Sequence, residues 1–187
     1  MRLLGNFALL EEIEPKHFSY VIAWRNDKKL NKYLNQPFVL TLESQQNWYE
    51  NIYLKDHNQK FMIMIDKETN LPFGTIGLTD LDRENKVCIM GRLLLGNTDY
   101  AQHPAFWEAV FIFSDYTYTL ADIDYIHVVK ENRNALRLNK ILGFIPNESE
   151  IKYPDELFVN GMEQIELYRT KEMYLKMREK LFNVLMS

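Results

Sequence analysis

Two short stretches of the sequence combine side chains that could bind or activate a small molecule. WRND brings together Trp24, Arg25 and Asn26; an indole can stack on a base or a sugar, and a guanidinium can bind phosphate. LTDLD places Asp80 and Asp82 after an apolar run, where a carboxylate could accept a proton through water. Each stretch also has a plain alternative, which is a packed Trp beside two solvated residues and two acids in a surface turn.

The histidines and the cysteine indicate no metal site. His17, His57 and His127 lack the spacing of metal ligands and are interpreted as structural or surface residues. His103 is a candidate donor to a phosphate group. Cys88 lies in the apolar run VCIM and is expected in the core, and a single cysteine excludes an intramolecular disulfide.

Length, composition and net charge limit which kinds of protein this chain can be. With 187 residues, 47% of them hydrophobic, the chain can bury a full core, and we expect one domain over residues 1–187. The net charge of −4 argues against a nucleic-acid partner, so local groups must meet any anionic ligand. No run approaches the roughly 20 apolar residues that cross a bilayer. The N-terminus lacks the form of a signal peptide. We therefore expect a soluble cytoplasmic protein without a membrane partner.

The candidate residues must be positioned by elements that the apolar patterns predict. In chain order these are a strand over 3–13, helices that begin at Pro15 and after Thr41, strands over 60–66, 72–82 and 86–96, a helix over 104–120, a strand over 122–130, a helix within 131–144, a strand pair over 158–170 and a helix over 171–186. Asn132 or Asn134 can cap the helix within 131–144, and Gly143 is placed to end it.

This order predicts an α+β fold. Three antiparallel strands precede a strand–helix–strand unit with a parallel pair at its centre. The result is a mixed, mostly antiparallel sheet of about six to seven strands with helices on both faces. The terminal helix could cover the core or meet a second copy of the chain, so a homodimer stays open.

Four passages resemble the Gcn5-related N-acetyltransferase (GNAT) family, in the branch that includes ribosomal-protein N-terminal acetyltransferases and bacterial amino-sugar acetyltransferases. WRND together with TLESQQNW (41–48) resembles the acceptor-side helices of sugar-directed members, and FGTIGLTDLD (73–82) resembles the third strand of the family. ENRNALRLNKILGF (131–144) resembles the helix after the fifth strand, and VNGMEQIELYR (159–169) resembles the ending of this branch. The resemblance covers nearly the whole chain.

The resemblance implies direct acetyl transfer from acetyl-CoA, bound between the two central parallel strands, to a primary amine, with no metal. Main-chain groups of Leu93, Leu94 and Leu95 would bind the pantetheine arm, and Asn132 would lie near the path of the cofactor. Trp24, Arg25 and Asn26 would line the acceptor site. Asp80 would orient or deprotonate the amine.

The expected pyrophosphate loop departs from the pattern of the family. Related proteins have an Arg or Gln, two residues, Gly, one residue, then Gly or Ala, whereas YAQHPAFWEA places Pro104 and Phe106 at the glycine positions. Amides around Gln102, His103 and Ala105 could still bind the phosphates, aided by the helix dipole. Alternatively, the thioester binds in another pose, or CoA no longer binds.

The usual tyrosine of the family, which protonates the departing thiolate, is replaced by Asn139. An amide can donate a hydrogen bond but cannot give up a proton at useful pH. Water could protonate the thiolate instead, or Tyr100 or Tyr116 could take the role, although packing is the simpler reading of Tyr116.

Three functions therefore compete. The preferred one is an N-acetyltransferase for a nucleotide-linked amino sugar. The same chemistry could instead act on a protein N-terminus or another small amine. A GNAT-like domain that binds a partner without cofactor is the alternative from a different class.

Overall fold

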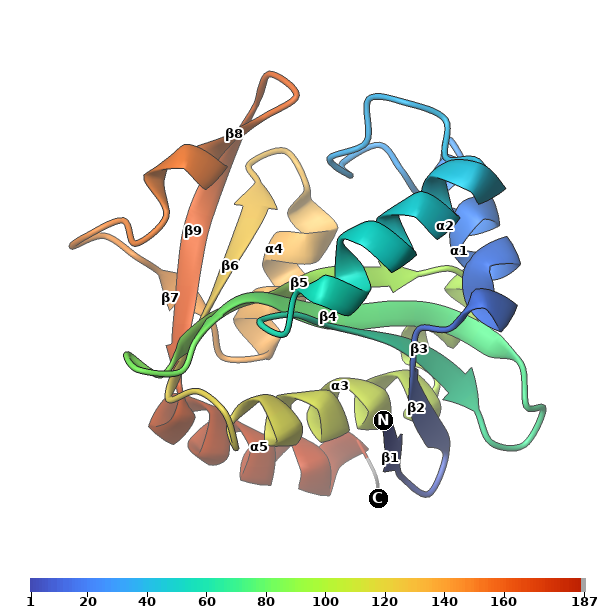
Figure 1. Ribbon diagram of the computed structural model, residues 1–187. Coiled ribbons are helices and arrows are strands. Elements are labelled where there is room, and N and C mark those ends of the chain that lie inside the picture. Colours follow the sequence, from blue (N-terminus) through green and yellow to red (C-terminus); the bar gives the residue numbers. More distant parts are fainter. Residues whose placement is uncertain (186–187) are drawn as a thin grey trace.

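A mixed β-sheet runs through the protein, and the computed structural model describes residues 1–185 (Figure 1). Across the sheet the strands follow the order β1-β2-β3-β4-β5-β6-β9-β7, and β8 pairs with β9. The strands are β1 (Arg2–Leu4), β2 (Ala8–Glu12), β3 (Lys60–Asp66), β4 (Pro72–Asp82), β5 (Val87–Leu95), β6 (Ile123–Val129), β7 (Ile145–Pro146), β8 (Phe158–Val159) and β9 (Met162–Thr170).

Helices cover both faces of this sheet. They are α1 (Phe18–Asn26), α2 (Leu42–Asn51), α3 (Pro104–Thr117), α4 (Arg133–Ile141) and α5 (Lys171–Leu185), with short 3-10 helices at Pro15–His17, Tyr53–Lys55, Thr98–Gln102 and Pro154–Leu157. Figure 1 shows α1 and α2 on one side of the sheet and α3 and α5 on the other. The main core packs Ala109, Val110 and Phe113 of α3 against the sheet, and a second core lies under α1 and α2.

The predicted fold class is confirmed. β5 and β6 run parallel, and the other pairings are antiparallel. The sheet has more strands than the six to seven predicted, because β1, β7 and β8 are two or three residues long. Strands this short produce no readable alternation.

Helix ends follow the local signals in the sequence. Oγ1 of Thr41 accepts from the Ser44 amide (3.1 Å) at the start of α2, and Oδ1 of Asn132 accepts from the Ala135 amide (3.1 Å) at the start of α4. Gly143, with φ of 86°, follows α4 in the left-handed conformation that glycine adopts without strain. These predictions are confirmed.

The N-terminal strand is a correction. The segment predicted as one strand over 3–13 is a hairpin of β1 and β2. The buried carboxylate of Glu108 on α3 accepts hydrogen bonds from the amides of Asn6 (2.7 Å), Phe7 (2.7 Å) and Ala8 (2.8 Å). This contact joins residues about a hundred positions apart, so local sequence does not reveal the turn. Among the described residues, no helix has the length and apolar character needed to cross a membrane.

Candidate active site

The parallel strands β5 and β6 separate soon after they begin. They pair only at Val87–Ile123, Cys88–Asp124 and Ile89–Tyr125. Beyond these pairs β5 continues along β4 as far as Leu95, while β6 continues along β9, and Figure 1 shows β6 turning away. The facing edges of the two strands therefore have no strand partner within the described residues. Backbone groups on such an edge are available to an extended ligand.

A β-bulge in β5 adds to this separation. Arg92 has a φ of 52°, the register against β4 shifts between Thr75 and Gly77, and Oγ1 of Thr75 donates to the Arg92 carbonyl (2.6 Å). A bulge bends its strand and re-aims the side chains beside it. A Cβ added to Gly91 would meet no atom within 4 Å, so open space lies next to the bend. The predicted segment Leu93–Leu95 follows directly and is half-buried.

The N-terminus of α3 lies near the same end of β5. His103 caps it, because its Nδ1 accepts from the Ala105 amide (3.2 Å) and its carbonyl accepts from the Phe106 amide (3.1 Å). Pro104 has no N–H. The Phe106 side chain is buried, so it adds no bulk outside the helix. The first turn thus keeps its dipole, but its first amides are already occupied, and Ala105 in particular is not a free donor. Gln102 is exposed.

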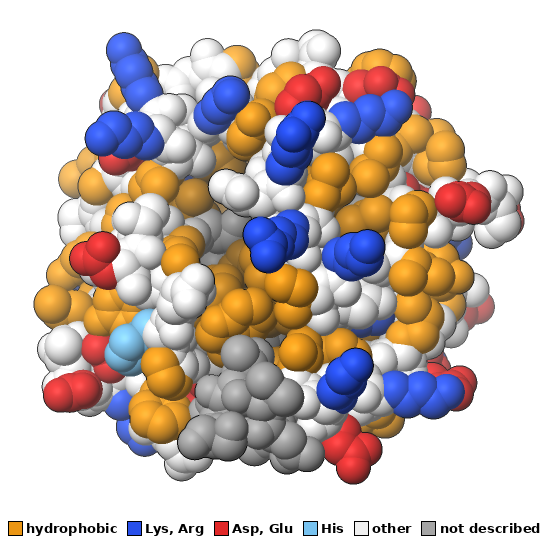
Figure 2. Space-filling view, turned by 180° about the vertical axis from the view of Figure 1, so that it is seen from behind, with side chains coloured by type: hydrophobic (Ala, Val, Ile, Leu, Met, Phe, Trp, Pro, Cys, Tyr) orange, Lys and Arg blue, Asp and Glu red, His pale blue; other side chains and the backbone are white. Residues whose placement is uncertain are grey.

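Helix α4 begins on the β6 side of the separation. Asn132 is its cap, and Asn139 is buried at 4% exposure, where Nδ2 donates to the Ala135 carbonyl (2.9 Å). Arg133, Arg137 and Lys140 of α4 are exposed. Figure 2, which views the protein from behind, shows hydrophobic side chains gathered in a hollow near the middle of that view, with Lys and Arg side chains to one side of it.

Tyr100 lies in the 3-10 helix that follows β5 and contacts β3 and β4. Its hydroxyl donates to Oδ2 of Asp66 (2.7 Å) at the end of β3, and its ring stacks on Phe73 with a centroid distance of 4.4 Å. In the sheet β3 is separated from β5 by β4. Tyr116 packs against the main core beside Phe113. The Tyr100 hydroxyl is thus engaged by Asp66, and a role of Tyr100 or Tyr116 as proton donor to the thiolate stays a prediction.

Trp24, Arg25 and Asn26 make different contacts in the structure. Trp24 lies against the end of β5, because a Cβ on Gly96 would fall 2.1 Å from its indole ring. Asn26 holds the segment between α1 and α2: its side chain exchanges two hydrogen bonds with the backbone of Leu40, each 2.8 Å long. Nε of Arg25 donates to Oε1 of Gln36 (2.6 Å) in that segment.

The segment between α1 and α2 also contacts the residues that follow β6. The Tyr33 hydroxyl donates to the carbonyl of Glu131 (3.3 Å), just before α4. The contact joins the segment between α1 and α2 to the residues between β6 and α4.

A buried histidine–glutamate pair joins β6 to β9, beyond the point where β6 separates from β5. Nε2 of His127 on β6 is 3.1 Å from Oε2 of Glu166 on β9, with side chains 7% and 1% exposed. Nδ1 of His127 makes no hydrogen bond within the described residues. The ring of Tyr153 packs edge-on against His127 and Tyr125. The sequence interpretation of His127 as structural or surface overlooked this pair, since its partner is distant in the chain and no local motif marks it.

Glu166 also organises the loop beside this pair. It accepts from Nδ2 of Asn147 (2.6 Å) and from the amides of Lys152 (2.8 Å) and Tyr153 (2.9 Å). Burial alone would raise the pKa of Glu166, but the hydrogen bonds from Lys152, Asn147, Tyr153 and His127 outweigh it and lower the pKa. Glu166 is thus an ionised, fully bonded acceptor.

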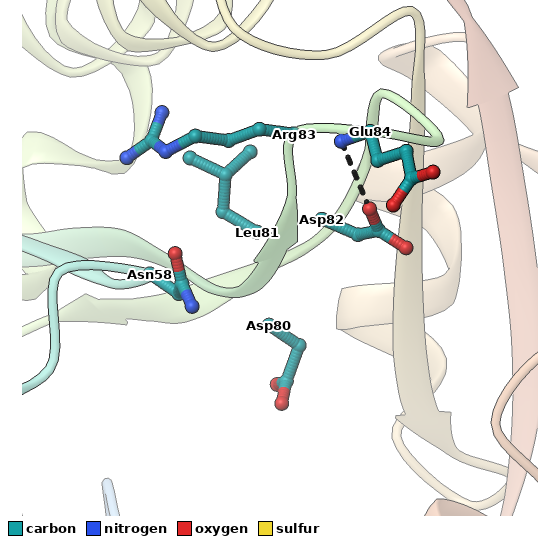
Figure 3. Close-up of a pocket in the computed structure, with 6 residues that line it drawn as sticks. All are labelled: Asn58, Asp80, Leu81, Asp82, Arg83 and Glu84. Atoms are coloured by element: carbon teal, nitrogen blue, oxygen red, sulfur yellow. Dashed lines mark hydrogen bonds between the residues drawn. The ribbon is translucent and has the colours of Figure 1, made fainter.

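The two candidate aspartates lie in different surroundings at the turn between β4 and β5. Asp82 accepts from Asn85 (2.6 Å through Nδ2) and from the Glu84 amide (3.0 Å), which lowers its pKa and stabilises the turn. Asp80 has a φ of 53° and is exposed, and Figure 3 shows its carboxylate pointing away from Asp82 and Glu84. They line a shallow pocket with Asn58, Leu81, Arg83 and Glu84.

Asp80 nevertheless acts on residues of the candidate site. Burial raises the pKa of Tyr153 to about 12, and the charge of Asp80 contributes to that rise. The charge of Asp80 also offsets part of the lowering that burial causes in the pKa of Arg92 on β5. Its side chain is therefore near the face of the sheet that carries His127 and Arg92. Among the described residues, no group of three or more His, Cys, Asp or Glu side chains is arranged to hold a metal ion.

Comparisons with known proteins agree with this geometry. A family model described as "Acetyltransferase (GNAT) domain" matches residues 8–145. No curated protein sequence matches the chain. The structure resembles a GCN5-related N-acetyltransferase from Brucella melitensis, with 18% identity, a TM-score of 0.80, and coverage of 99% of this chain and 85% of that one.

Two further structures name an acceptor. One is apo FdhC, a nucleotide-linked sugar GNAT, with 19% identity, a TM-score of 0.74, and coverage of 97% of this chain and 96% of that one. The other is spermidine N-acetyltransferase from Vibrio cholerae in complex with CoA and spermine, with 17% identity, a TM-score of 0.73, and coverage of 91% and 99%. At these identities the likeness concerns the fold.

Proposed function

Because the chain belongs to the GNAT acetyltransferase family, we propose that it transfers the acetyl group of acetyl-CoA to a primary amine, and that a nucleotide-linked amino sugar is the preferred acceptor. The observation that supports this most directly is the separation of β5 and β6 beside the bulge at Arg92, which leaves an unpaired strand edge and open space at Gly91. The whole chain would act as one acetyltransferase domain.

The unpaired edge fits the arm of acetyl-CoA. Leu93, Leu94 and Leu95 would offer main-chain groups to the amides of the arm, as an added strand would bind. Acetyl-CoA supplies a thioester whose carbonyl carbon the amine attacks, so that a C–N bond forms and the C–S bond breaks.

The phosphates would be bound differently from the usual glycine-rich loop. His103 and Pro104 leave few free amides at the start of α3, so the helix dipole and the exposed Gln102 side chain would contribute there. The basic residues of α4, Arg133, Arg137 and Lys140, would supply the positive charge. This arrangement favours the reading in which CoA still binds over a domain that has lost it.

His127 is the stronger candidate for the group that takes the proton of the acceptor ammonium. An Nε2–H donated to Glu166 would leave Nδ1 of His127 without a proton and able to accept one. Asp80 would orient the amine from the turn between β4 and β5. The departing thiolate would be protonated by water, with Asn139 limited to hydrogen bonding.

Two readings of the acceptor compete with a nucleotide-linked sugar. A protein N-terminus or another small amine would use the same chemistry, and one of the structural neighbours is a spermidine acetyltransferase. Trp24 beside the end of β5 and Arg25 in the same helix favour an acceptor with a ring and an anionic group.

Thermal unfolding with and without acetyl-CoA tests the reaction class. A ligand that binds only the folded protein, at about 100 times its dissociation constant, adds about 2.7 kcal/mol to the free energy of unfolding. A shift followed by CoA release with UDP- or TDP-linked amino sugars would support the proposal. The absence of any shift at millimolar acetyl-CoA would refute the enzyme, and turnover with peptides or polyamines alone would refute the sugar acceptor.

A further inference from the structure

Two arginines on the α1–α2 side of the sheet are partly buried without a carboxylate partner. Neither Arg25 nor Arg92 forms an ion pair within the described residues. The contrast with Arg169 is clear, because that buried guanidinium donates to Oδ2 of Asp124 (2.8 Å) and to the Leu142 carbonyl (2.8 Å). The fully buried Arg169 is therefore neutralised by a carboxylate, whereas, within the described residues, Arg25 and Arg92 are not.

Arg92 is held in a fixed position by its neighbours. Its guanidinium lies 5.3 Å from the ring of Trp48 and 5.1 Å from the ring of Phe61, and one terminal nitrogen donates to Oε1 of the buried Gln59 (2.5 Å). The bulge in β5 places this side chain there. A guanidinium has five N–H donors, so a single hydrogen bond leaves most of its capacity unused.

Arg25 adds a second positive charge on the same side of the sheet, because α1, which carries Arg25, packs against α2, whose Trp48 contacts Arg92. Nε donates to Gln36, and its remaining N–H groups have no partner within the described residues. Burial is the main cause that lowers the pKa of Arg92 to about 10, and the charge of Arg25 contributes to that lowering. Asp56 and Asp80 oppose this effect through space, but neither forms an ion pair with either arginine.

Such an arrangement is unfavourable without a ligand. Two like charges repel each other, and partial burial weakens the solvation that would relieve them. A bound anion would remove both penalties. Guanidinium groups bind phosphate oxygens through paired hydrogen bonds, and a phosphate or diphosphate can accept from two arginines at once.

We propose that Arg25 and Arg92 together form a subsite for the phosphate or diphosphate of the acceptor, on the face of the sheet opposite α3. The assignment of this anion to the acceptor rests on the proposed acetyltransferase function. The subsite lies on the side of α1 and α2, apart from α3, where the phosphates of CoA would bind. It selects against polyamines, because a polycation would meet two unneutralised guanidinium groups.

Calorimetric titration with UDP and with inorganic pyrophosphate tests the subsite. Saturating CoA is included so that the α3 end is already filled. The wild-type protein should bind UDP, and R92Q and R25Q should each weaken binding by about tenfold or more, since hydrogen bonds to charged groups are strong. R92K should lie between wild type and R92Q, because it retains the charge and loses the planar fork.

K28Q is the matched control. Lys28 is exposed and lies three residues after Arg25, and the substitution removes one positive charge, as R25Q does. It should bind UDP as the wild type does. Unchanged UDP binding in both arginine variants, an equal loss in K28Q, or tighter binding of spermine than of UDP would each overturn the subsite. Binding of pyrophosphate as tight as that of UDP would assign the affinity to the phosphates alone, as proposed.

Two further measurements keep the outcomes separate. Thermal unfolding without ligand shows whether each variant folds; if R92Q does not, R25Q and R92K decide. Acetyl-CoA binding is measured on the same proteins. Acetyl-CoA binding and turnover without UDP binding would overturn only the subsite, whereas UDP binding without acetyl-CoA binding would overturn only the acetyltransferase function.

Discussion

Nε2 of His127 lies 3.1 Å from Oε2 of Glu166, and the two residues are direct partners across β6 and β9. This pair occupies the part of β6 that has left β5, on the edge where the acetyl group would be transferred. A carboxylate that accepts from one ring nitrogen fixes the orientation and the tautomer of an imidazole.

Replacing His127 by Gln should lower kcat by about a hundredfold or more, because positioned general bases contribute on that scale. The loss should diminish as the pH rises and more of the amine is deprotonated in solution, while acetyl-CoA binding stays unchanged. Steady-state CoA release over a range of pH measures this. H57Q, at an exposed histidine, is the control. Wild-type turnover in H127Q would show that another group takes the proton.

Replacing Glu166 by Gln should destabilise the protein by about 1–3 kcal/mol at neutral pH, since a buried carboxylate with several donors is lost. The folded state lowers the pKa of Glu166, so this stabilisation is present above the unfolded pKa and is lost as the pH falls through the folded value. The difference between the two proteins should therefore shrink below about pH 4.3.

Denaturant unfolding at several pH values checks this behaviour of Glu166. E163Q is the control, because the Lys130–Glu163 pair is exposed and should contribute less than about 1 kcal/mol. A difference between wild type and E166Q that does not depend on pH would mean that Glu166 is not ionised in the folded protein.

Replacing Asn139 by Tyr should raise turnover, because a phenol can protonate the departing thiolate and an amide cannot. The same change should lower the free energy of unfolding by about 1–3 kcal/mol, since Asn139 is 4% exposed and extra volume must be accommodated. Single-turnover rates and denaturant unfolding separate the two effects. Equal or slower turnover in a folded N139Y protein would show that no proton donor is missing.

Replacing Arg169 by Met should destabilise the protein by about 3–5 kcal/mol, because Asp124 would remain buried without its partner. The double variant D124N/R169M should recover part of this loss. K176Q is the control, as the Lys176–Glu172 pair on α5 is exposed. Equal stability of R169M and wild type in denaturant unfolding would mean that the pair makes no net contribution.

The sequence predicted the elements whose signals are local. Thr41 and Asn132 cap helices through side chains three residues from the amides they bind, and Gly143 adopts the backbone conformation for which glycine is suited. The three antiparallel strands and the parallel pair followed from alternation and chain order. Local signals therefore sufficed for the fold class and for the placement of Leu93–Leu95 and α4.

Only the tertiary structure decided how the candidate site is assembled. Glu108 binds the amides in the turn of the N-terminal hairpin, Glu166 contacts His127 from 39 positions away, and the bulge carries Arg92, whose guanidinium lies over Trp48 of α2. The tertiary structure also joins the Tyr100 hydroxyl to Asp66 of β3, a partner 34 positions away. Each of these depends on contacts between distant segments, whose energies are expressed only when the sheet has formed, so no local pattern in the sequence records them.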